Sequence, residues 1–307
     1  MNNTTVLVKE LRQATGASFL DCKQALVTND GNYEQATTFL RQKNLNKAAK
    51  KADRQTTEGL VVVKTNETSV SMVGLNCETD FVALTPDFKA FTHQLADMVL
   101  ADASLTDAEK LATATWASSG QDAASTNPTQ SVQEAIQSLI GKLGENIKLG
   151  HVARHTASET SIVHGYVHAG AIDGYGQNEG RLGVLVEVAF GDKTIAHDLA
   201  LHIASAAPKY VSIADIPADV VAKKTAQLRA EVADENKPDD IKEKMVAGRL
   251  NKFYQQDCLL EQPFLKDDSL SVTEWLNAKS NETGTATSAG SGQTVSVLNF
   301  TRVAIDT

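Results

Sequence analysis

The sequence predicts an α+β fold in which helices pack on antiparallel sheets. Two observations carry this prediction. Segments with the alternating apolar pattern of strands are interrupted by segments with the apolar spacing of amphipathic helices. Where two strand-type segments follow each other directly, as over 58–77, the turn between them is short enough for a hairpin.

The composition favours a cytoplasmic chain and excludes several functional classes. The 307 residues carry a net charge of -9, whereas a protein that binds naked RNA or DNA needs clustered Lys and Arg. No apolar run approaches the ~20 residues that span a bilayer, and the first residues lack a signal-peptide pattern. Cys22, Cys77 and Cys258 are far apart, as is typical of reduced thiols. We therefore expect neither nucleic acid nor membrane as a direct partner.

Residues 1–45 predict a small domain of three short helices. Apolar residues recur at helical spacing on both sides of a break at Thr15-Gly16. Ser18 and Asn32 are suited to cap the second and third helices. A minimal core can then form from one large apolar residue of each helix, namely Leu11, Leu26 and Phe39.

A basic segment follows, with a linker over 46–57. Between Arg41 and Arg54, basic residues stand against a single acidic residue, Asp53. Two interpretations remain open. The segment is a basic patch for RNA or an acidic partner, or it is a helical linker whose charges only face water.

Residues 58–146 predict a first core subdomain. Strands over 58–64 and 70–77 form an antiparallel hairpin. Thr85 as N-cap and Pro86 at the first helical position begin an amphipathic helix. The remainder is expected to contain further helices over 106–116 and 132–143, with a loop over 117–130.

Residues 147–212 and 257–307 predict a second, related subdomain. Its expected elements are strands over 147–155, 162–169 and 182–190, helices over 194–207 and 272–276, a low-complexity loop over 281–293, and a final strand with regular alternation over 295–305.

Residues 213–256 predict a protruding helical hairpin. Two charged helices, over 217–233 and 238–256, are joined by a short segment and therefore run antiparallel. Their apolar stripes are thin, which allows them to seal against each other but not to form a globular core.

Signatures of catalysis, cofactor binding and metal binding are missing. The chain has neither GxxxxGK[ST] nor GxSxG. The pairs His151/His155 and His164/His168 have i,i+4 spacing, but they lie in strand-type segments, where four residues span ~13 Å. We expect no catalytic residue, no cofactor and no metal site, and a protein that is not an enzyme. A His-dependent metalloenzyme is the weakest alternative.

The junction Asn76 to Ala83 places an acidic and an aromatic residue side by side between a strand and a helix. In one interpretation, Phe81 plugs the core beneath the connection and Asp80 serves the turn, since Phe is often buried. In the other, Asp80 and Phe81 project as a wedge for a partner's cleft, since aromatic residues anchor interfaces. The pattern alone leaves both open.

Several sequence blocks follow one another along nearly the whole chain: Leu7-Val8-Lys9-Glu10-Leu11-Arg12, Asp21-Cys22-Lys23-Gln24-Ala25-Leu26, Lys47-Ala48-Ala49-Lys50, Asn76-Cys77-Glu78-Thr79-Asp80-Phe81-Val82-Ala83, Gly144-Glu145-Asn146-Ile147, Gly180-Arg181-Leu182-Gly183-Val184-Leu185 and Gln262-Pro263-Phe264. In sequence and order these blocks resemble the bacterial elongation factor Ts family.

The resemblance implies a guanine-nucleotide exchange factor for GDP-bound elongation factor Tu, the GTPase that delivers aminoacyl-tRNA to the ribosome. It implies a ubiquitin-associated-like (UBA-like) three-helix domain at 1–45, a core of two α+β subdomains and a coiled-coil hairpin. It also implies a wedge that enters the partner near its Mg²⁺ and releases GDP without covalent chemistry. The wedge consists of Thr79, Asp80, Phe81 and Val82.

Further partner contacts implied by the resemblance are Leu11, Phe19, Leu20 and Lys23 in the N-terminal domain, and Leu143, Gly144, His168 and Leu265 in the core. An insertion over 171–179 interrupts the family pattern after His168. The family includes dimers, so a homodimer is an alternative to a monomer. The competing hypothesis is a UBA-like adaptor or scaffold without exchange activity.

Overall fold

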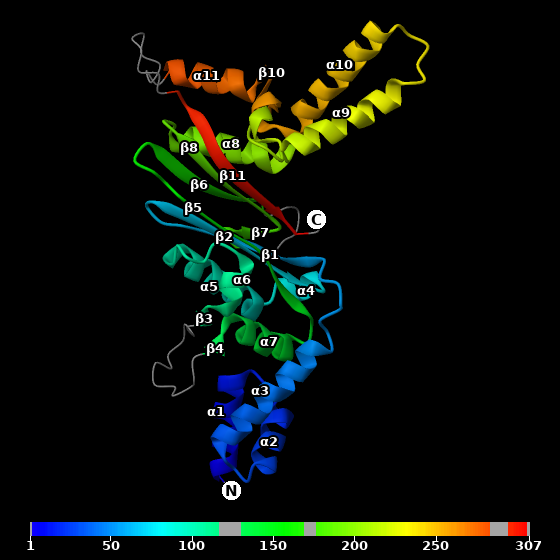
Figure 1. The fold of residues 1–307 in the computed structure, drawn as a ribbon. Coiled ribbons are helices and arrows are strands. Elements are labelled where there is room, and N and C mark those ends of the chain that lie inside the picture. The colour runs from blue at the N-terminus through cyan, green and yellow to red at the C-terminus, as the bar shows by residue number, and fades with distance from the viewer. Residues whose placement is uncertain (1, 117–129, 169–175, 283–293, 306–307) are drawn as a thin grey trace.

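The computed structural model describes residues 2–116, 130–168, 176–282 and 294–305. The molecule is elongated, with a group of three helices at one end and a projecting pair of helices at the other (Figure 1). Between them lie antiparallel sheets with helices on their outer faces. The predicted α+β class is confirmed.

The N-terminal group contains α1 (Asn2–Thr15), α2 (Phe19–Thr28) and α3 (Tyr33–Ala49). The predicted caps form, because the Ser18 side chain accepts the N–H of Asp21 and the Asn32 side chain accepts the N–H of Gln35. Each cap satisfies a backbone donor that the helix itself leaves unpaired.

The core of this group differs from the prediction at one position. Leu11 and Leu26 are buried as expected, but Phe39 is 37% exposed and the neighbouring Leu40 is buried instead. Ala36 and Leu40 are one helical turn apart and face α1 and α2 together. Phe39 therefore points away from this core, although its size made it the stronger candidate in the sequence.

The helix α3 continues past residue 45, so the predicted limit between domain and linker falls inside a helix. Its last turns pack on α7 (Val132–Leu143). Asn44 is only 5% exposed, and a Cβ atom at Gly141 would lie 2.4 Å from its Oδ1 atom. Ala48 reaches into the core of the next region. The three helices are thus joined to the rest of the molecule by packing.

The first sheet has the order β5-β2-β1-β7, with antiparallel neighbours. Its strands are β1 (Glu58–Thr65), β2 (Ser69–Cys77), β5 (Ile147–Thr156) and β7 (Glu179–Gly180). The hairpin of β1 and β2 matches the prediction. The grouping of β5 does not, because this strand was expected in the second subdomain and pairs along β2 instead.

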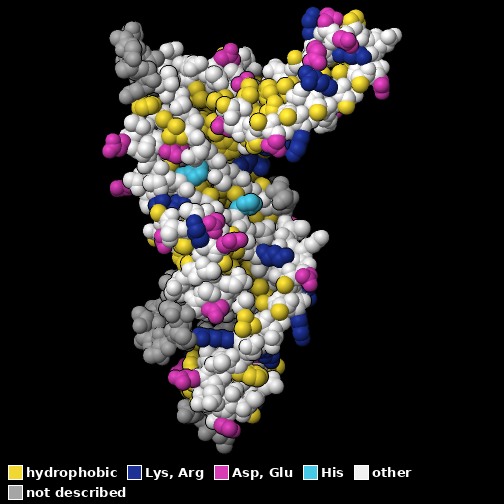
Figure 2. Space-filling view, in the orientation of Figure 1, with side chains coloured by type: hydrophobic (Ala, Val, Ile, Leu, Met, Phe, Trp, Pro, Cys, Tyr) yellow, Lys and Arg dark blue, Asp and Glu magenta, His cyan; other side chains and the backbone are white. Residues whose placement is uncertain are grey.

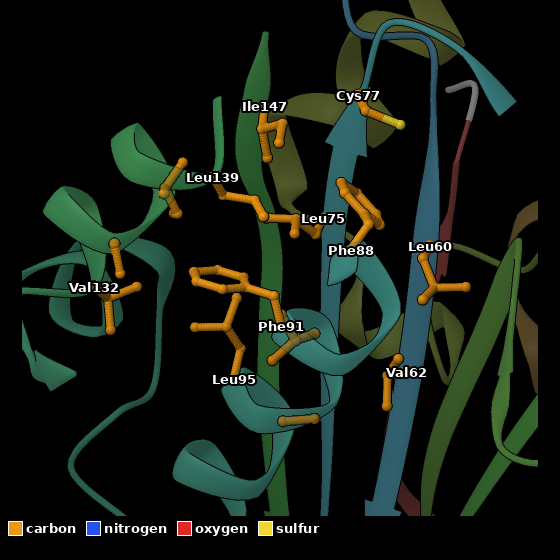
Figure 3. Close-up of a cluster of buried hydrophobic side chains, with 14 of the residues drawn as sticks. Leu60, Val62, Leu75, Cys77, Phe88, Phe91, Leu95, Val132, Leu139 and Ile147 are labelled. Atoms are coloured by element: carbon orange, nitrogen blue, oxygen red, sulfur yellow. The ribbon is translucent and has the colours of Figure 1, made fainter. Parts of the chain in front are cut away.

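Helices cover the outer face of this sheet (Figure 3). They are α4 (Asp80–Ala83), α5 (Pro86–Ala101), α6 (Ala108–Thr113) and α7. Leu95, Phe91 and Phe88 of α5 share one buried cluster with the sheet residues Leu75 and Leu60. The helix expected over 106–116 ends at Thr113, and the strands β3 (Thr115–Trp116) and β4 (Gln130–Ser131) follow. The rest of the loop expected there, 117–129, lies outside the described residues.

The second sheet has the order β11-β8-β6. Its strands are β6 (Ser161–His168), β8 (Leu182–Ala189) and β11 (Ser296–Ala304), and its outer face is covered by α8 (Lys193–Ala206) and α11 (Val272–Glu282).

The sequence predicted regular alternation along the final strand, but β11 does not alternate regularly. Its pairing with β8 shifts between Val297 and Asn299. Before this bulge Val297 packs under the helices, whereas beyond it Val303 packs between the two sheets. An extra residue in one strand reverses which side chains face which layer, and only the pairing reveals it.

The two sheets pack face to face through a shared apolar layer. It contains residues of both sheets, among them Val61, Met72, Leu185 and Val303. Gly183 allows the close approach, because a Cβ atom there would lie 2.5 Å from Sδ of Met72. The two predicted subdomains therefore share a core.

The projecting pair consists of α9 (Ala218–Val232) and α10 (Asp239–Asp257). Leu228, Val232 and Val246 form a small buried seam between them. Acidic and basic side chains are interspersed over the outer end of the pair (Figure 2). At its base lie the short elements η1 (Ile213–Asp215), η2 (Leu259–Glu261), β9 (Pro263–Phe264) and β10 (Asp267–Ser271).

Two predicted irregular segments are described only in part. In the segment 281–293, residues 281 and 282 belong to the end of α11 and the others lie outside the described residues. In the insertion 171–179, the described residues begin at Gly176. Among the helices of the described ranges, none has the length and apolar character needed to cross a membrane.

Candidate partner-binding site

The junction after β2 folds into one helical turn, α4. Thr79 has an extended backbone, and its hydroxyl accepts the N–H of Val82 as an N-cap. The Asp80 carboxylate accepts the N–H of Phe81 at 2.9 Å, close to the positive end of the turn. Both residues before Phe81 are thus engaged with the backbone around it.

Phe81 projects from this turn into solvent. Its side chain is 81% exposed, whereas the following residues Val82 and Ala83 are 8% and 1% exposed. Successive residues of a helix point ~100° apart, so that Val82 and Ala83 directed into the core leave Phe81 outside. The interpretation of Phe81 as a core plug is wrong, and Val82, which was predicted to contact a partner, fills that place instead.

Thr79, the N-cap residue of the turn, is also held by Glu145, which follows α7. The Thr79 backbone N–H donates to Oε2 of Glu145 at 3.0 Å, and its hydroxyl donates to Oε1 at 2.6 Å. The thiol of Cys77 donates to the Thr79 carbonyl at 3.1 Å. Burial raises the pKa of the Cys77 thiol to about 12, which favours the protonated form of this cysteine at neutral pH.

Glu78, which directly precedes Thr79, binds residues of two other segments. Its Oε1 atom accepts the backbone N–H of Asn146 at 2.6 Å, and its carboxylate also pairs with Arg54 at 3.3 Å. The Asn146 N–H, assisted by the Arg54 guanidinium, lowers the pKa of the Glu78 carboxyl. The carboxylate is therefore charged at neutral pH and holds both groups.

Leu143 and Gly144, for which the resemblance implies partner contacts, lie at the C-terminal end of α7. Gly144 ends α7 in the left-handed conformation at φ 83°, which favours glycine, and it is exposed. Leu143 is half-buried against the first core. Since Glu145 follows directly and bonds to Thr79, these residues and Phe81 belong to one surface region.

The N-terminal candidates divide between surface and core. Phe19 is 51% and Leu20 75% exposed, and Lys23 is exposed on the next turn of α2. Val27, which the sequence analysis did not select, is 67% exposed and extends this apolar surface; its i+7 spacing from Leu20 was the available signal. Leu11 is fully buried, so it supports the helices and has no surface to offer a partner.

The start of α2 lies near the end of α7. A Cβ atom at Gly16 would approach Cδ of Lys142 to 3.2 Å.

The remaining candidates, His168 and Leu265, lie on the second sheet and near its helices. His168 ends β6, is exposed, and its Nδ1 atom lies 3.2 Å from Oη of Tyr166. Leu265 is 53% exposed, and its backbone N–H donates to Nδ1 of His202 on α8. Among the hydrogen bonds of the described residues, neither residue is joined to α4.

The inserted segment before β8 is held against α5 at its described end. Glu179 is 4% exposed and pairs with Lys89 at 2.6 Å and with Nε2 of His93 at 2.8 Å. Burial raises the pKa of the Glu179 carboxyl, but the hydrogen bonds from Lys89, Gly176 and His93 outweigh it and the net pKa is lowered.

The histidine pairs noted in the sequence do not form as pairs. His151, His155, His164 and His168 all lie in strands, and His164 instead meets His197 of α8, with 3.2 Å between Nε2 and Nδ1. Over the ranges that the structure describes, no three His, Cys, Asp or Glu side chains are placed to hold a metal ion.

The basic segment from Arg41 to Arg54 forms ion pairs and hydrogen bonds with other parts of the same chain. Lys43 and Lys47 pair with Asp21 of α2 at 2.7 and 3.1 Å, and Lys51 donates to the carbonyl of Gly144. The hydrogen bond from Lys43 is the main cause that lowers the pKa of the Asp21 carboxyl to about 2. Neither earlier interpretation described this use of the segment, in which the charges join α2, α3 and the end of α7.

Comparison with known proteins places the chain among translation elongation factors. A family model described as elongation factor TS matches residues 78–306. Relatives named elongation factor Ts occur in Clostridium botulinum strain Alaska E43 (38% identical over 286 residues, 91% of this chain and 88% of the relative) and Clostridium novyi strain NT (36% over 288 residues, 92% and 88%). Another occurs in Chlorobium phaeobacteroides strain BS1 (36% over 276 residues, 88% and 90%). The chain belongs to the elongation factor Ts family.

Proposed function

We propose that this chain binds GDP-bound elongation factor Tu and promotes the release of its GDP, as a guanine-nucleotide exchange factor. The observation that carries the proposal is the 81% exposure of Phe81 on a turn whose other side is buried. Burial of a Phe side chain is worth about 1.5–3 kcal/mol, so exposure gives the free chain no advantage. An exposed aromatic residue beside a carboxylate is suited to a pocket on a partner.

In the proposed mechanism, Phe81 enters an apolar slot between two helices of the GTPase domain, and Asp80 holds the displaced helix. The displacement removes contacts that hold Mg²⁺ and the phosphates of GDP. Because coupling between binding sites is reciprocal, the exchange factor and GDP weaken each other's binding by the same factor. Burial of one Phe is comparable to the typical coupling of about 1–3 kcal/mol.

The other contacts would provide affinity. We assign α1 to α3 to the family's UBA-like domain, docking through Phe19, Leu20 and Lys23, and α9 with α10 to its coiled-coil hairpin. Leu143 and Gly144 would form the rim of the wedge, while His168 and Leu265 would contact the partner separately. The exposure of these side chains, half-buried Leu143 apart, supports the assignment.

The decisive experiment is the release of fluorescent GDP from preloaded elongation factor Tu in a stopped-flow instrument. Addition of this chain at micromolar concentration should accelerate release, with a rate that saturates at a maximal value. Release at the spontaneous rate would refute the proposal.

The wedge is tested by the double variant Asp80→Ala with Phe81→Ala. Its maximal release rate should fall about 30-fold, which corresponds to ~2 kcal/mol, while its affinity for nucleotide-free elongation factor Tu changes much less. Leu298→Ala is a matched control, since Leu298 is a 48% exposed apolar residue on β11 outside the proposed contacts. Equal maximal rates for the double variant and the control would contradict the wedge assignment.

The adaptor hypothesis has support from one observation, the exposed apolar surface of α2. It predicts that the chain binds a partner but leaves GDP release unchanged. The same stopped-flow traces, combined with a binding titration, distinguish the two functions.

A further inference from the structure

Two short segments that lie far apart in the chain exchange hydrogen bonds at the start of α4. The Glu145 carboxylate accepts the backbone N–H and the hydroxyl of Thr79. In the opposite direction, the Glu78 carboxylate accepts the backbone N–H of Asn146. Glu145 thus binds Thr79, the residue after Glu78, and Glu78 binds Asn146, the residue after Glu145. We call Glu78, Thr79, Glu145 and Asn146 the crossed clamp.

The crossed clamp also holds the chain that leads from α3 to β1. The Asn146 side chain is 2% exposed, and its Nδ2 atom donates to the carbonyls of Arg54 at 2.9 Å and Ala52 at 3.3 Å. The Arg54 guanidinium pairs in turn with Glu78. Lys51 of the same segment donates to the Gly144 carbonyl. The N-terminal helices are thereby connected to the base of the wedge. The bonds of the Asn146 side chain are partly buried, whereas those of the Arg54 and Lys51 side chains are exposed.

A turn as short as α4 depends on such support. Isolated helices below ~12 residues are marginal in water, and α4 has 4 residues. Val82 and Ala83 fix only its inner side. A side chain that must displace a helix of its partner experiences an opposing force, and a turn free to tilt would give way. Bonds at Thr79, the N-cap residue of α4, resist this tilt.

We propose that Glu145 and Asn146 are positioning residues for nucleotide exchange, which hold Phe81 in the orientation that displaces the partner's helix. This inference rests on the proposed exchange function. Loss of the clamp should leave the docking surfaces intact, so that the chain still binds but transmits less of its binding free energy to the nucleotide site. Preorganised contacts lose less free energy to ordering than flexible ones.

The test uses Glu145→Gln in the full chain. The amide oxygen can still accept the Thr79 N–H, but the NH₂ group cannot accept the proton of the Thr79 hydroxyl, and the negative charge that strengthens both bonds is removed without a change in shape. Glu274→Gln is a matched control, because the Glu274 carboxylate likewise accepts the backbone N–H and hydroxyl of one residue, Ser271, at 2.7 and 2.8 Å. That site lies on α11, away from α4.

Stopped-flow release of fluorescent GDP is measured as a function of the concentration of each variant, together with its melting temperature. For Glu145→Gln the maximal rate should fall about tenfold, within the range typical of coupling between sites. Its half-saturating concentration should remain within about twofold of the unsubstituted chain. The melting temperatures of both variants should fall by similar amounts, and the control should keep the full maximal rate.

An unchanged maximal rate for Glu145→Gln would overturn the inference while leaving the exchange function in place. A raised half-saturating concentration at full maximal rate would also overturn it, because Glu145 would then act in docking. Asn146→Ala provides a second variant with the same expected split, since it removes the bonds to the segment after α3 without adding a group. If the unsubstituted chain fails to accelerate GDP release, the exchange function itself is refuted and this inference with it.

Discussion

Large apolar side chains are exposed both on α2 and at α4, and the two regions hold them in different ways. On α2, Phe19, Leu20 and Val27 are spread over a helix of 10 residues that packs on a small core. At α4, Phe81 stands alone on a turn that is fixed by the crossed clamp and by Val82. A broad apolar surface provides binding affinity, whereas a single side chain held in one orientation can displace a helix of the partner. The difference suggests separate roles in docking and in exchange.

The comparison is tested most strongly by removing the apolar surface of α2. In the variant Phe19→Ser with Leu20→Ser, the dissociation constant for nucleotide-free elongation factor Tu should rise about 30-fold, equivalent to ~2 kcal/mol. At saturating concentration the maximal rate of GDP release should remain unchanged. A fall in the maximal rate without a change in affinity would place exchange, rather than docking, on α2.

A smaller effect is expected when Phe81 keeps its apolar character but loses its ring. Phe81→Leu should lower the maximal release rate about fivefold, equivalent to ~1 kcal/mol, because the shorter side chain fills less of the slot. The affinity should stay close to that of the unsubstituted chain, as measured by titration. A weaker affinity with full maximal rate would show that α4 docks in the same manner as α2.

The smallest expected effect is a pH dependence in the stability of the N-terminal helices, which are held in part by the ion pairs of Asp21. The folded pKa of Asp21 lies at about 2, below its ordinary value of 3.8, so its pairing with Lys43 and Lys47 stabilises the N-terminal helices fully above the ordinary value. This contribution, about 1 kcal/mol or less for such partly exposed pairs, is lost as the pH falls from ~5 to about 2.

Hydrogen exchange of the α2 amides, expressed as protection factors, checks this expectation. Protection in the unsubstituted chain should fall between pH 5 and pH 3 by up to about fivefold. In Asp21→Asn protection should already be reduced at pH 5 and should change less on acidification. Equal pH responses in both proteins would show that the pairs with Asp21 do not stabilise α2.

Many elements could be predicted because their signals are local. Ser18, Asn32 and Thr85 cap helices where the sequence placed them. The hairpin of β1 and β2 forms in register across Glu58 and Cys77. Capping and alternation depend on residues within a few positions of one another, so they are visible without knowledge of distant contacts.

The candidate site was predicted in part. Exposure of Phe19, Leu20, Phe81 and Leu265 agrees with a role in binding, whereas Leu11 and Val82 are buried. Phe81 and Val82 are adjacent apolar residues, and the sequence cannot tell which of them faces the core. The direction was decided by the packing of Val82 and Ala83 and by the bonds between Thr79 and Glu145.

By itself, the sequence determined the α+β class, most helices and strands and, through its resemblance, the family. Only the tertiary structure decided which sheet β5 joins, where β11 reverses its faces, and that the basic segment 41–54 bonds to Asp21, Glu78 and Gly144. The physical reason is the range of the interactions. Caps and periodicity act over a few residues, whereas strand pairing, burial and the crossed clamp depend on which distant segments meet.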